Sequence, residues 1–319
     1  MKKIPRRSFL AATAALAAAS LTAGCSGPGD GKTHLTFQIW DVAQRDGMQA
    51  MCDAYTVQHP DVVIEVQVTS WNEYWTKLEA ATMARQAPDI FWMHTNEILK
   101  YADNGKLPDC SAIVETEHFS DISLANASGS DGKLYAVPKD KEAVGLVYKK
   151  EQFDAAGVSY PDDTWTWDTL CEASQKIYDA TGYYGYMAYG DDQLGYWNFV
   201  YQAGGSILTE DKTRANFDDP ATRMGMEFYI NLQKNDWCPT QTYFAETSPG
   251  TAFFSGYGSM FLEGNWNILS ELQNYPEMVG KWDVAVLPKC PNPLNGDGRA
   301  SISNGLSYAT TTTNKHLDV

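Results

Sequence analysis

The chain has 319 residues, of which 44% are hydrophobic and 13% aromatic, with ten tryptophans and a formal net charge of −16. This length and hydrophobic content allow two domains with packed cores. The acidic balance argues against nucleic acid and against direct docking on anionic lipid, although solubility alone also explains it. The five histidines are scattered, and neither C-x-x-C nor H-E-x-x-H occurs, so we expect no metal site and no cofactor.

The first 25 residues have the pattern of an export signal. Four basic residues precede an alanine-rich apolar stretch, Phe9 to Leu21, which is too short for a stable membrane span. The run from Leu21 to Cys25 resembles the lipobox of bacterial lipoproteins. The resemblance implies a signal peptide over residues 1–24 and acylation of Cys25, whose acyl chains anchor the protein to the lipid bilayer at the outer face of the cytoplasmic membrane. The alternative is an ordinary secretory signal with a chance cysteine.

The export route stays open at the sequence level. The run from Arg6 to Leu10, Arg-Arg-Ser-Phe-Leu, resembles a twin-arginine motif, and the weakly hydrophobic segment after it suits that route. A Sec signal whose basic end happens to be Arg-Arg explains the same residues. Because four basic and no acidic residues precede Cys25, cleavage there would change the net charge from −16 to −20.

Strands and helices alternate after a flexible tether over residues 25–33. We expect strands at Leu35–Trp40, Val62–Val68 and Pro88–Met93, and helices at Met48–His59, Trp71–Arg85 and Ile98–Asn104. This order predicts a parallel sheet with helices on both faces, with ligands beyond the carboxyl ends of its strands. Trp40, Asp41, Trp92 and His94 fall at those ends.

The second half continues with mixed elements. Extended segments are expected up to Pro138 and over Glu142–Lys150, and later strands near Met260 and over Trp282–Pro288. A short helix should close at Gly157. Two longer helices should run from an N-cap at Thr166 to Ala180 and from Asp219 to Lys234.

Several short motifs occur in one order along the chain. They are Ala87–Ile90, Gly132–Pro138, Leu146–Lys150, Thr164–Asp168, Gly258–Met260, Gly264–Trp266, Val286–Pro288 and Asn304-Gly305. Together they resemble the family 1 extracellular solute-binding proteins, the sugar-binding subunits of ABC importers, over residues 33–319. One departure is Tyr148-Lys149-Lys150, where the family usually has Tyr-Asn-Lys.

This resemblance implies an α/β fold with two lobes, of the class II periplasmic-binding-protein type, that closes at a hinge. The chain should cross between lobes near Val144 and return between Pro288 and Arg299. The N-lobe would comprise residues 34–143 plus 290–319, and the C-lobe residues 144–289. Since family members continue into further C-terminal helices, we expect the C-terminal part to be missing from this sequence.

The resemblance also implies a monomeric binding protein, not an enzyme, that captures a sugar or oligosaccharide and delivers it to the transmembrane subunits of an ABC permease. Carboxylates and amides bond sugar hydroxyls, and aromatic rings stack on sugar faces. The family pattern places ligand contacts at Trp40, Asp41, Trp92, Asp140, Glu142, Trp197, Trp266 and Asn304, with Trp266 the foremost candidate. Core burial is the alternative for each tryptophan, and a solvated turn for Asp140 and Glu142.

Two other functions fit the composition. A binding lipoprotein for a polyamine, peptide or metal complex would also suit an acidic chain. A glycoside hydrolase would use paired carboxylates, although neither a serine nucleophile elbow nor a phosphate loop is present. Apart from Cys25, five cysteines remain (Cys52, Cys110, Cys171, Cys238 and Cys290), so at least one lacks an intramolecular partner. Their pairing stays open.

Overall fold

The computed structural model describes residues 30–317, so the predictions at Cys25 and at Arg6-Arg7 lie outside the described residues. The chain divides into two compact units, the first ending at Ile90 and the second beginning at Phe91. Within residues 30–317, no helix combines the length and the apolar character that crossing a bilayer requires.

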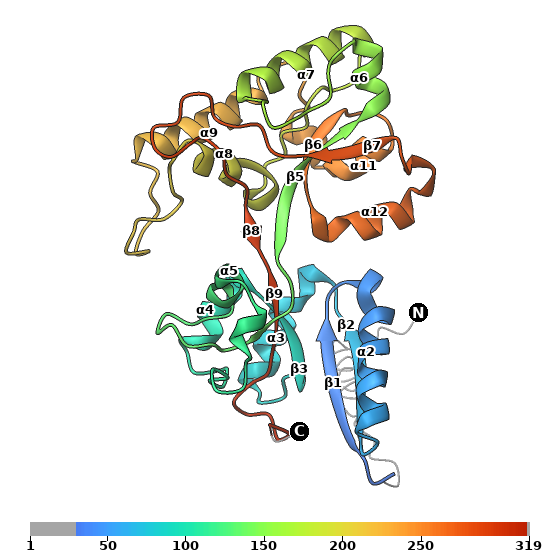
Figure 1. Cartoon of the computed structure of the whole chain (residues 1–319), viewed down its shortest axis with the longest axis vertical. Helices are drawn as coiled ribbons and strands as arrows, with labels where there is room; N and C mark the ends of the chain where they lie inside the picture. The colour runs from blue at the N-terminus through green and yellow to red at the C-terminus, as the bar shows by residue number, and fades with distance from the viewer. Residues whose placement is uncertain (1–29, 318–319) are drawn as a thin grey trace, which may run out of the picture. The chain divides into compact units, whose positions relative to one another are not determined.

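The first unit is built on two parallel strands. Strands β1 (Thr33–Ile39) and β2 (Val62–Val68) pair in register from Thr33↔Val62 to Ile39↔Val68. Every second residue of β1 from Leu35 onward is buried, which is the alternation that the sequence predicts for a strand with one covered face. Helices α2 (Arg45–Gln58) and α3 (Trp71–Met83) complete this unit, together with the short 3-10 turn η1 (Val42–Gln44) (Figure 1).

The second unit begins with a small antiparallel group. Strand β3 (Ile90–His94) pairs with β9 (Leu306–Ala309), and β9 also pairs with β4 (Val137–Pro138), both antiparallel. Helices α4 (Thr95–Ala102) and α5 (Asp121–Asn126) and the turn η2 (Thr116–His118) belong to the same region. The predicted parallel pairing is confirmed for β1 with β2. The sequence did not predict the antiparallel pairing of β3 with β9, which comes from the far end of the chain.

A second sheet has β5 (Glu142–Lys149) at its centre. Strands β6 (Met260–Gly264) and β7 (Trp282–Ala285) flank β5, both antiparallel to it. At its start β5 also pairs with β8 (Ser303–Asn304), with Glu142 opposite Asn304. Figure 1 shows β5 and β8 running side by side as two extended segments. The expected lobe limits at these segments stay a prediction.

Helices pack around this second sheet. They are α6 (Lys150–Ala156), α7 (Trp167–Thr181), the π-helical turn η3 (Asp192–Tyr196), α8 (Trp197–Gln202), α9 (Pro220–Leu232), α10 (Gln241–Phe244), α11 (Pro249–Phe254) and α12 (Ile268–Asn274), with turns η4 (Asn265–Asn267) and η5 (Pro276–Met278). The predicted N-cap is confirmed, because the Thr166 side chain accepts a hydrogen bond from the Thr169 N–H. Gly157 ends α6 with φ +62°, in the left-handed region.

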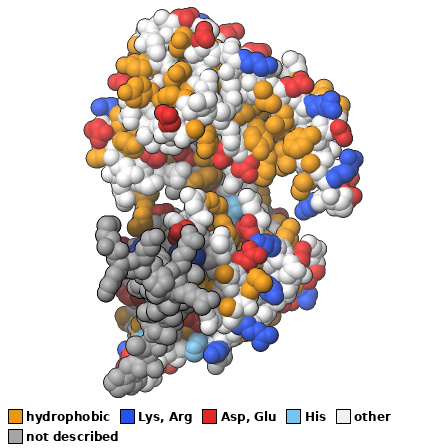
Figure 2. All heavy atoms as spheres, turned by 180° about the vertical axis from the view of Figure 1, so that it is seen from behind, with side chains coloured by type: hydrophobic (Ala, Val, Ile, Leu, Met, Phe, Trp, Pro, Cys, Tyr) orange, Lys and Arg blue, Asp and Glu red, His pale blue; other side chains and the backbone are white. Residues whose placement is uncertain are grey.

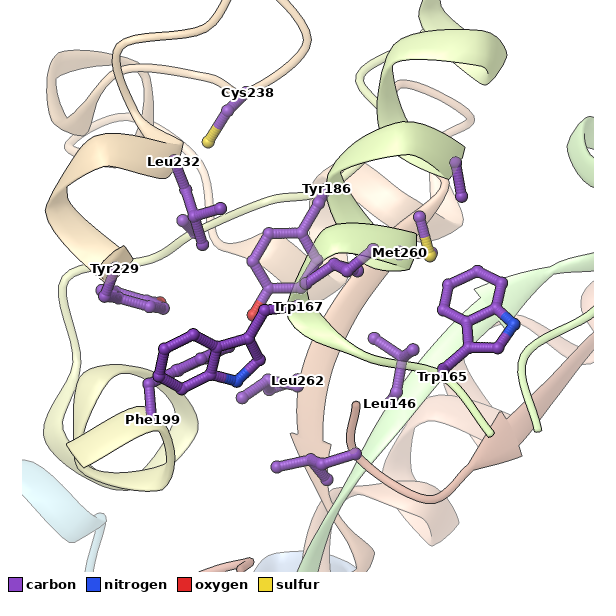
Figure 3. Close-up of a cluster of buried hydrophobic side chains, with 14 of the residues drawn as sticks. Leu146, Trp165, Trp167, Tyr186, Phe199, Tyr229, Leu232, Cys238, Met260 and Leu262 are labelled. Atoms are coloured by element: carbon purple, nitrogen blue, oxygen red, sulfur yellow. The ribbon is translucent and has the colours of Figure 1, made fainter. Parts of the chain in front are cut away.

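An aromatic core packs between the sheet centred on β5 and its helices (Figure 3). Trp165 and Trp167 are both buried, so these motif tryptophans are structural. The Trp167 indole stacks on Phe228, with ring centroids 4.2 Å apart, and its Nε1–H donates to Gln202 Oε1 at 2.6 Å. The five cysteines among the described residues are all free thiols, four of them buried, so none of them forms a disulfide within residues 30–317.

Candidate functional site

Four aromatic rings cluster at the carboxyl end of β1 in the first unit. Trp40 follows β1, and its ring centroid lies 5.1 Å from Trp71, 4.9 Å from Tyr74 and 5.8 Å from Trp75. Tyr74 is buried, whereas Trp71 is 43% exposed. The cluster therefore combines a packed base with an open indole face, which is what stacking on an apolar ligand face requires.

Asp41 caps the short turn that follows this cluster. One carboxylate oxygen accepts from the Ala43 N–H and the other from Gln44 Nε2, both at 2.8 Å. The carboxylate is therefore engaged in local hydrogen bonds, although each oxygen has a second lone pair that can accept from a hydroxyl. Trp71 and Trp75 were not predicted as site residues; their spacing of four residues on a predicted helix is the signal that could have suggested them.

In the second unit, Trp266 lies in the turn between β6 and α12. Its indole is half-buried and packs against the aromatic core. The ring also contacts Gly264 so closely that a Cβ atom at Gly264 would be 2.2 Å from Cε2 and Cζ2 of the indole. The ring is therefore fixed in position while part of its surface stays accessible.

The neighbours of Trp266 tie this turn to the rest of the unit. Asn265 Oδ1 accepts from the Ala143 N–H on β5 at 2.9 Å. Asn267 Nδ2 donates to Glu263 Oε1 at 2.9 Å, and the Gly264 N–H donates to the same oxygen at 2.8 Å. Glu263 was not predicted, although an acidic residue inside the apolar run Met260–Leu262 and Gly264 is an available signal.

A buried polar group lies where β8 meets β5. The Asn304 amide nitrogen donates to Gln193 Oε1 and lies 3.3 Å from His94 Nε2. Its Oδ1 atom is buried and has no hydrogen-bond partner among residues 30–317. A buried acceptor of this kind is costly when it is left unsatisfied.

His94 is held as a neutral side chain. Its Nδ1 accepts from the Asn96 N–H at 3.1 Å and so caps α4. Burial lowers the pKa of His94 to about 4, although the carboxylates of Asp140 and Asp192 act in the opposite direction. The ring is therefore uncharged at neutral pH. Burial, which favours the neutral imidazole, has a larger effect on the pKa than the two carboxylates, which favour the charged form.

Asp140 is bonded on both sides. Its Oδ1 accepts from the Leu306 N–H at 2.8 Å, and its Oδ2 is 2.6 Å from Lys139 Nζ. The Lys139 ammonium also lies 4.7 Å from the Trp92 ring centroid. Trp92 itself is fully buried, so this tryptophan contributes to the packing of the second unit and presents no open face for stacking.

The remaining predicted residues lie at the ends of nearby elements. Glu142 is 7% exposed and begins β5 opposite Asn304. Trp197 is half-buried at the start of α8, with its ring edge-on to Tyr196 at 6.5 Å. The next residue, Asn198, accepts from the Ile302 N–H at 2.8 Å and so fixes the start of α8 beside the segment that leads to β8.

The structure thus places Trp92 and Asp140 beside β9, and Glu142 opposite Asn304 in the β5–β8 pair. Asn265 connects the Trp266 turn to β5. Trp40 and Asp41 belong to the first unit and form a separate group there. Two cavities of about 300 Å³ lie elsewhere, one lined by residues of the first unit that include Gln49 and the other around Tyr243 and Tyr257. Neither cavity is lined by a predicted site residue.

Electrostatics and metal chemistry add two observations. Acidic and basic side chains are interspersed on the described surface that Figure 2 shows, without one continuous basic patch in that view. Within residues 30–317, no group of three or more His, Cys, Asp or Glu side chains is arranged to hold a metal ion. The polar groups present are amides, carboxylates and a neutral imidazole, which can bond the hydroxyls of a neutral ligand.

Known proteins resemble this chain over most of its length. Residues 41–318 match the profile of a family described as bacterial extracellular solute-binding protein. The lactose-binding protein of Rhizobium radiobacter is 24% identical over 316 residues, which cover 95% of this chain and 70% of that protein. The arabinooligosaccharide-binding protein of Halalkalibacterium halodurans is 24% identical and covers 72% of this chain and 57% of its own length. An uncharacterized lipoprotein of Streptomyces antibioticus is 28% identical over 166 residues, 49% of this chain and 37% of that protein.

Solved structures agree with the fold. The GacH receptor of Streptomyces glaucescens superimposes with a TM-score of 0.79 at 24% identity, covering 90% of this chain and 73% of that one. The ABC substrate-binding protein Lmo0181 of Listeria monocytogenes, in complex with cycloalternan, gives a TM-score of 0.76 at 25% identity over 88% of this chain and 71% of that one. The predicted periplasmic-binding-protein-like α/β fold is therefore confirmed.

Proposed function

Because the chain belongs to the bacterial extracellular solute-binding proteins, which are binding proteins and not enzymes, we propose that it captures a sugar or oligosaccharide reversibly for an ABC importer. The captured ligand is released unchanged to the transmembrane subunits of the permease. Lobe closure about the β5–β8 pair accompanies capture.

The observation that carries this proposal is the surroundings of Trp266. A half-buried indole, fixed on Gly264, occurs in a turn that is bonded to β5, and β5 pairs with the strand that carries Asn304. An aromatic face together with an unsatisfied amide oxygen matches the two kinds of surface of a sugar, its apolar faces and its hydroxyl rim. The open indole of Trp71 beside Trp40 supplies a second stacking surface in the first unit.

The relatives support the ligand class. Proteins whose names state binding of lactose and of arabinooligosaccharides match this chain over 95% and 72% of its length. A structural neighbour at 25% identity holds cycloalternan. We therefore place the ligand among neutral mono- and oligosaccharides.

Calorimetry tests the assignment. Lactose, maltose, diacetylchitobiose and arabino-oligosaccharides are titrated into the purified protein and into Trp266→Ala. For a sugar that the wild type binds, the variant should bind about 30-fold more weakly, as expected for ~2 kcal/mol from a hot-spot aromatic. Tyr257→Ala, at a residue that is 59% exposed and outside the proposed site, serves as the control and should bind as the wild type does. Undiminished affinity in Trp266→Ala would exclude Trp266 as the stacking residue.

One observation favours a second ligand class. The net charge of −16 would attract a cationic solute such as a polyamine. Spermidine belongs in the same titration series. Binding of spermidine without binding of any sugar would replace the carbohydrate proposal, and the family membership would be unaffected.

We further propose that Cys25 anchors the protein to the outer face of the cytoplasmic membrane. The lipobox-like residues support this, as does the likeness to a Streptomyces lipoprotein. Labelling with a radioactive palmitate should mark the wild type but not Cys25→Ser, which should be released into the medium. Replacement of Arg6 and Arg7 by lysine separates the export routes, because only twin-arginine export should fail.

A further inference from the structure

Glu263 is a buried carboxyl group at the end of β6. Its exposed fraction is 6%, and it faces Gly145 across the β5–β6 pair. Burying a carboxylate is costly unless it is strongly hydrogen-bonded. The contacts of Glu263 therefore indicate why this position carries an acid in an otherwise apolar strand.

Those contacts clamp the turn that carries Trp266. Glu263 Oε1 accepts from the Gly264 N–H at 2.8 Å and from Asn267 Nδ2 at 2.9 Å, so one oxygen holds both ends of the turn. Trp266 lies between these two donors in the sequence, and its ring rests on Gly264. The position of the indole is thus set by the same turn that the carboxylate holds.

The charged groups around Glu263 are acidic. Glu271 on α12 and Asp191, just before η3, both raise the pKa of the Glu263 carboxyl, and burial raises it most. Helix α11 (Pro249–Phe254) packs on β6 and contains no charged residue, and β5 presents Gly145 at this point. A Cβ atom at Gly250 on α11 would lie 3.0 Å from Glu271 Oε1 and 3.9 Å from Glu263 Oε2, so the two carboxyl groups border the same space.

The opposing influences on Glu263 bring its protonation into the physiological range. Burial and the two neighbouring acids favour the neutral form, whereas the hydrogen bonds from Gly264 and Asn267 favour the charged form. The result is a pKa of about 7 in place of the usual 4.5. Both protonation states are therefore populated near neutral pH.

We propose that Glu263 is a positioning residue for Trp266, whose protonation loosens the turn over Gly264–Asn267 and so makes sugar affinity depend on pH. This inference rests on the proposed function, because it assigns regulation to the Trp266 surface. The charged carboxylate accepts stronger hydrogen bonds than the neutral acid. Affinity is therefore higher above pH 7, and we expect it to fall about threefold to tenfold between pH 8 and pH 6, the equivalent of one ordinary hydrogen bond.

A measurement without ligand tests whether protonation of Glu263 changes the surroundings of Trp266. Tryptophan emission is recorded from pH 5 to 9 for the wild type and for Trp266→Phe, and the difference reports the surroundings of Trp266. The difference signal should titrate with a midpoint near 7 in the wild type and stay flat when Glu263→Gln is present in both proteins. A flat signal in the wild type would overturn the inference.

Neighbouring variants provide controls if Glu263→Gln folds poorly. Glu271→Gln removes a like charge, so it should move the midpoint to lower pH and keep the amplitude. Glu277→Gln, on the exposed turn η5, should leave the midpoint where it is. An unchanged midpoint in Glu271→Gln would contradict the assignment of the fluorescence titration to the Glu263 carboxyl group.

Affinity measurements test whether protonation of Glu263 changes sugar binding. The tightest sugar of the calorimetric panel is titrated at pH 6 and pH 8 into the wild type and into Glu263→Gln. The ratio of the two dissociation constants should be about threefold to tenfold for the wild type and close to one for the variant. Equal ratios in the two proteins would refute the inference, even if Trp266→Ala has shown that Trp266 contacts the ligand. If the emission depends on pH but no sugar binds, only the proposed function is refuted.

Discussion

The Trp266 indole and the Cα atom of Gly264 are in such close contact that even a methyl group would not fit between them, since a Cβ atom there would be 2.2 Å from two ring carbons. The backbone of Gly264 is extended, with φ −87°, so its need for glycine arises from this contact and not from its conformation. In the sequence Gly264-Asn265-Trp266, the glycine thus provides the surface against which the indole ring is positioned.

Gly264→Ala should therefore displace the indole. We expect a loss of about 1–3 kcal/mol in the free energy of unfolding, as for other overpacked sites, and a loss of sugar affinity close to that of Trp266→Ala. Urea denaturation and calorimetry measure the two effects. Gly47→Ala on α2 is the matched control, because its Cβ would meet nothing within 4 Å; it should stabilise the protein by about 0.5–1 kcal/mol. Wild-type affinity in Gly264→Ala would show that the ring position does not matter for binding.

Asp140 should contribute to stability. Its two oxygens bond the Leu306 N–H and the Lys139 ammonium, and side-chain exposure is only 26% and 12% for the acid and the lysine. Asp140→Asn removes the charge partner of a largely buried lysine that also stacks on Trp92. We expect unfolding to require about 1–3 kcal/mol less free energy, measured by urea denaturation. If instead stability is unchanged and sugar affinity falls tenfold, Asp140 is a ligand contact, as the family resemblance implies.

Much of the local structure could be predicted because local signals determine it. Alternating apolar residues in Leu35–Ile39 predict β1, and the cap at Thr166 fixes the start of α7 in both sequence and structure. The short strands β8 and β9 were not predicted, since strands of two and four residues carry too little periodicity to detect.

The candidate site was only partly predictable for a similar reason. Trp266 is recognisable from the turn residues beside it, but the clamp by Glu263 depends on which atoms the turn brings together. Likewise, Trp92 was expected at the end of a strand, but it lies in the middle of β3 (Ile90–His94) and is fully buried there. A sequence pattern can place a tryptophan in a strand, but exposure of its ring depends on contacts from distant segments.

Lys149 provides a test of the departure from the family motif. Where the family usually has asparagine, this lysine is 1% exposed, its Nζ donates to the Phe253 carbonyl and it lies 4.8 Å from the Phe253 ring centroid. Lys149→Asn shortens the side chain, so it should leave a cavity and remove the hydrogen bond from Nζ to the Phe253 carbonyl, which keeps its backbone bond from the Gly256 N–H. We expect a loss of about 2–4 kcal/mol in thermal or urea unfolding.

The adjacent lysine is the matched control for that change. Lys150 is partly exposed and forms an ion pair with Asp283 at 3.1 Å. Because exposed ion pairs contribute little, Lys150→Asn should cost less than about 1 kcal/mol. Equal losses in the two variants would mean that burial of Lys149 does not determine its contribution.

The pH dependence of stability should contain two opposing contributions. The pKa of His94 is lowered from 6.5 to about 4, so the unfolded chain binds the proton more tightly and His94 makes stability rise between pH 4 and 6.5. The pKa of Glu263 is raised from 4.5 to about 7, so the native state binds the proton more tightly and Glu263 makes stability fall between pH 4.5 and 7. Each shift corresponds to about 3 kcal/mol at most.

Removing one contribution should therefore reveal the other. Glu263→Gln should steepen the rise in stability from pH 4.5 to 7 and make the protein more stable relative to the wild type at pH 8 than at pH 4.5. His94→Gln should do the reverse and leave a stability that falls over the same interval, because only the Glu263 contribution remains there. Urea unfolding at half-unit pH steps measures both slopes for the wild type and the two variants. Parallel stability curves for all three proteins would show that neither group changes its pKa on folding.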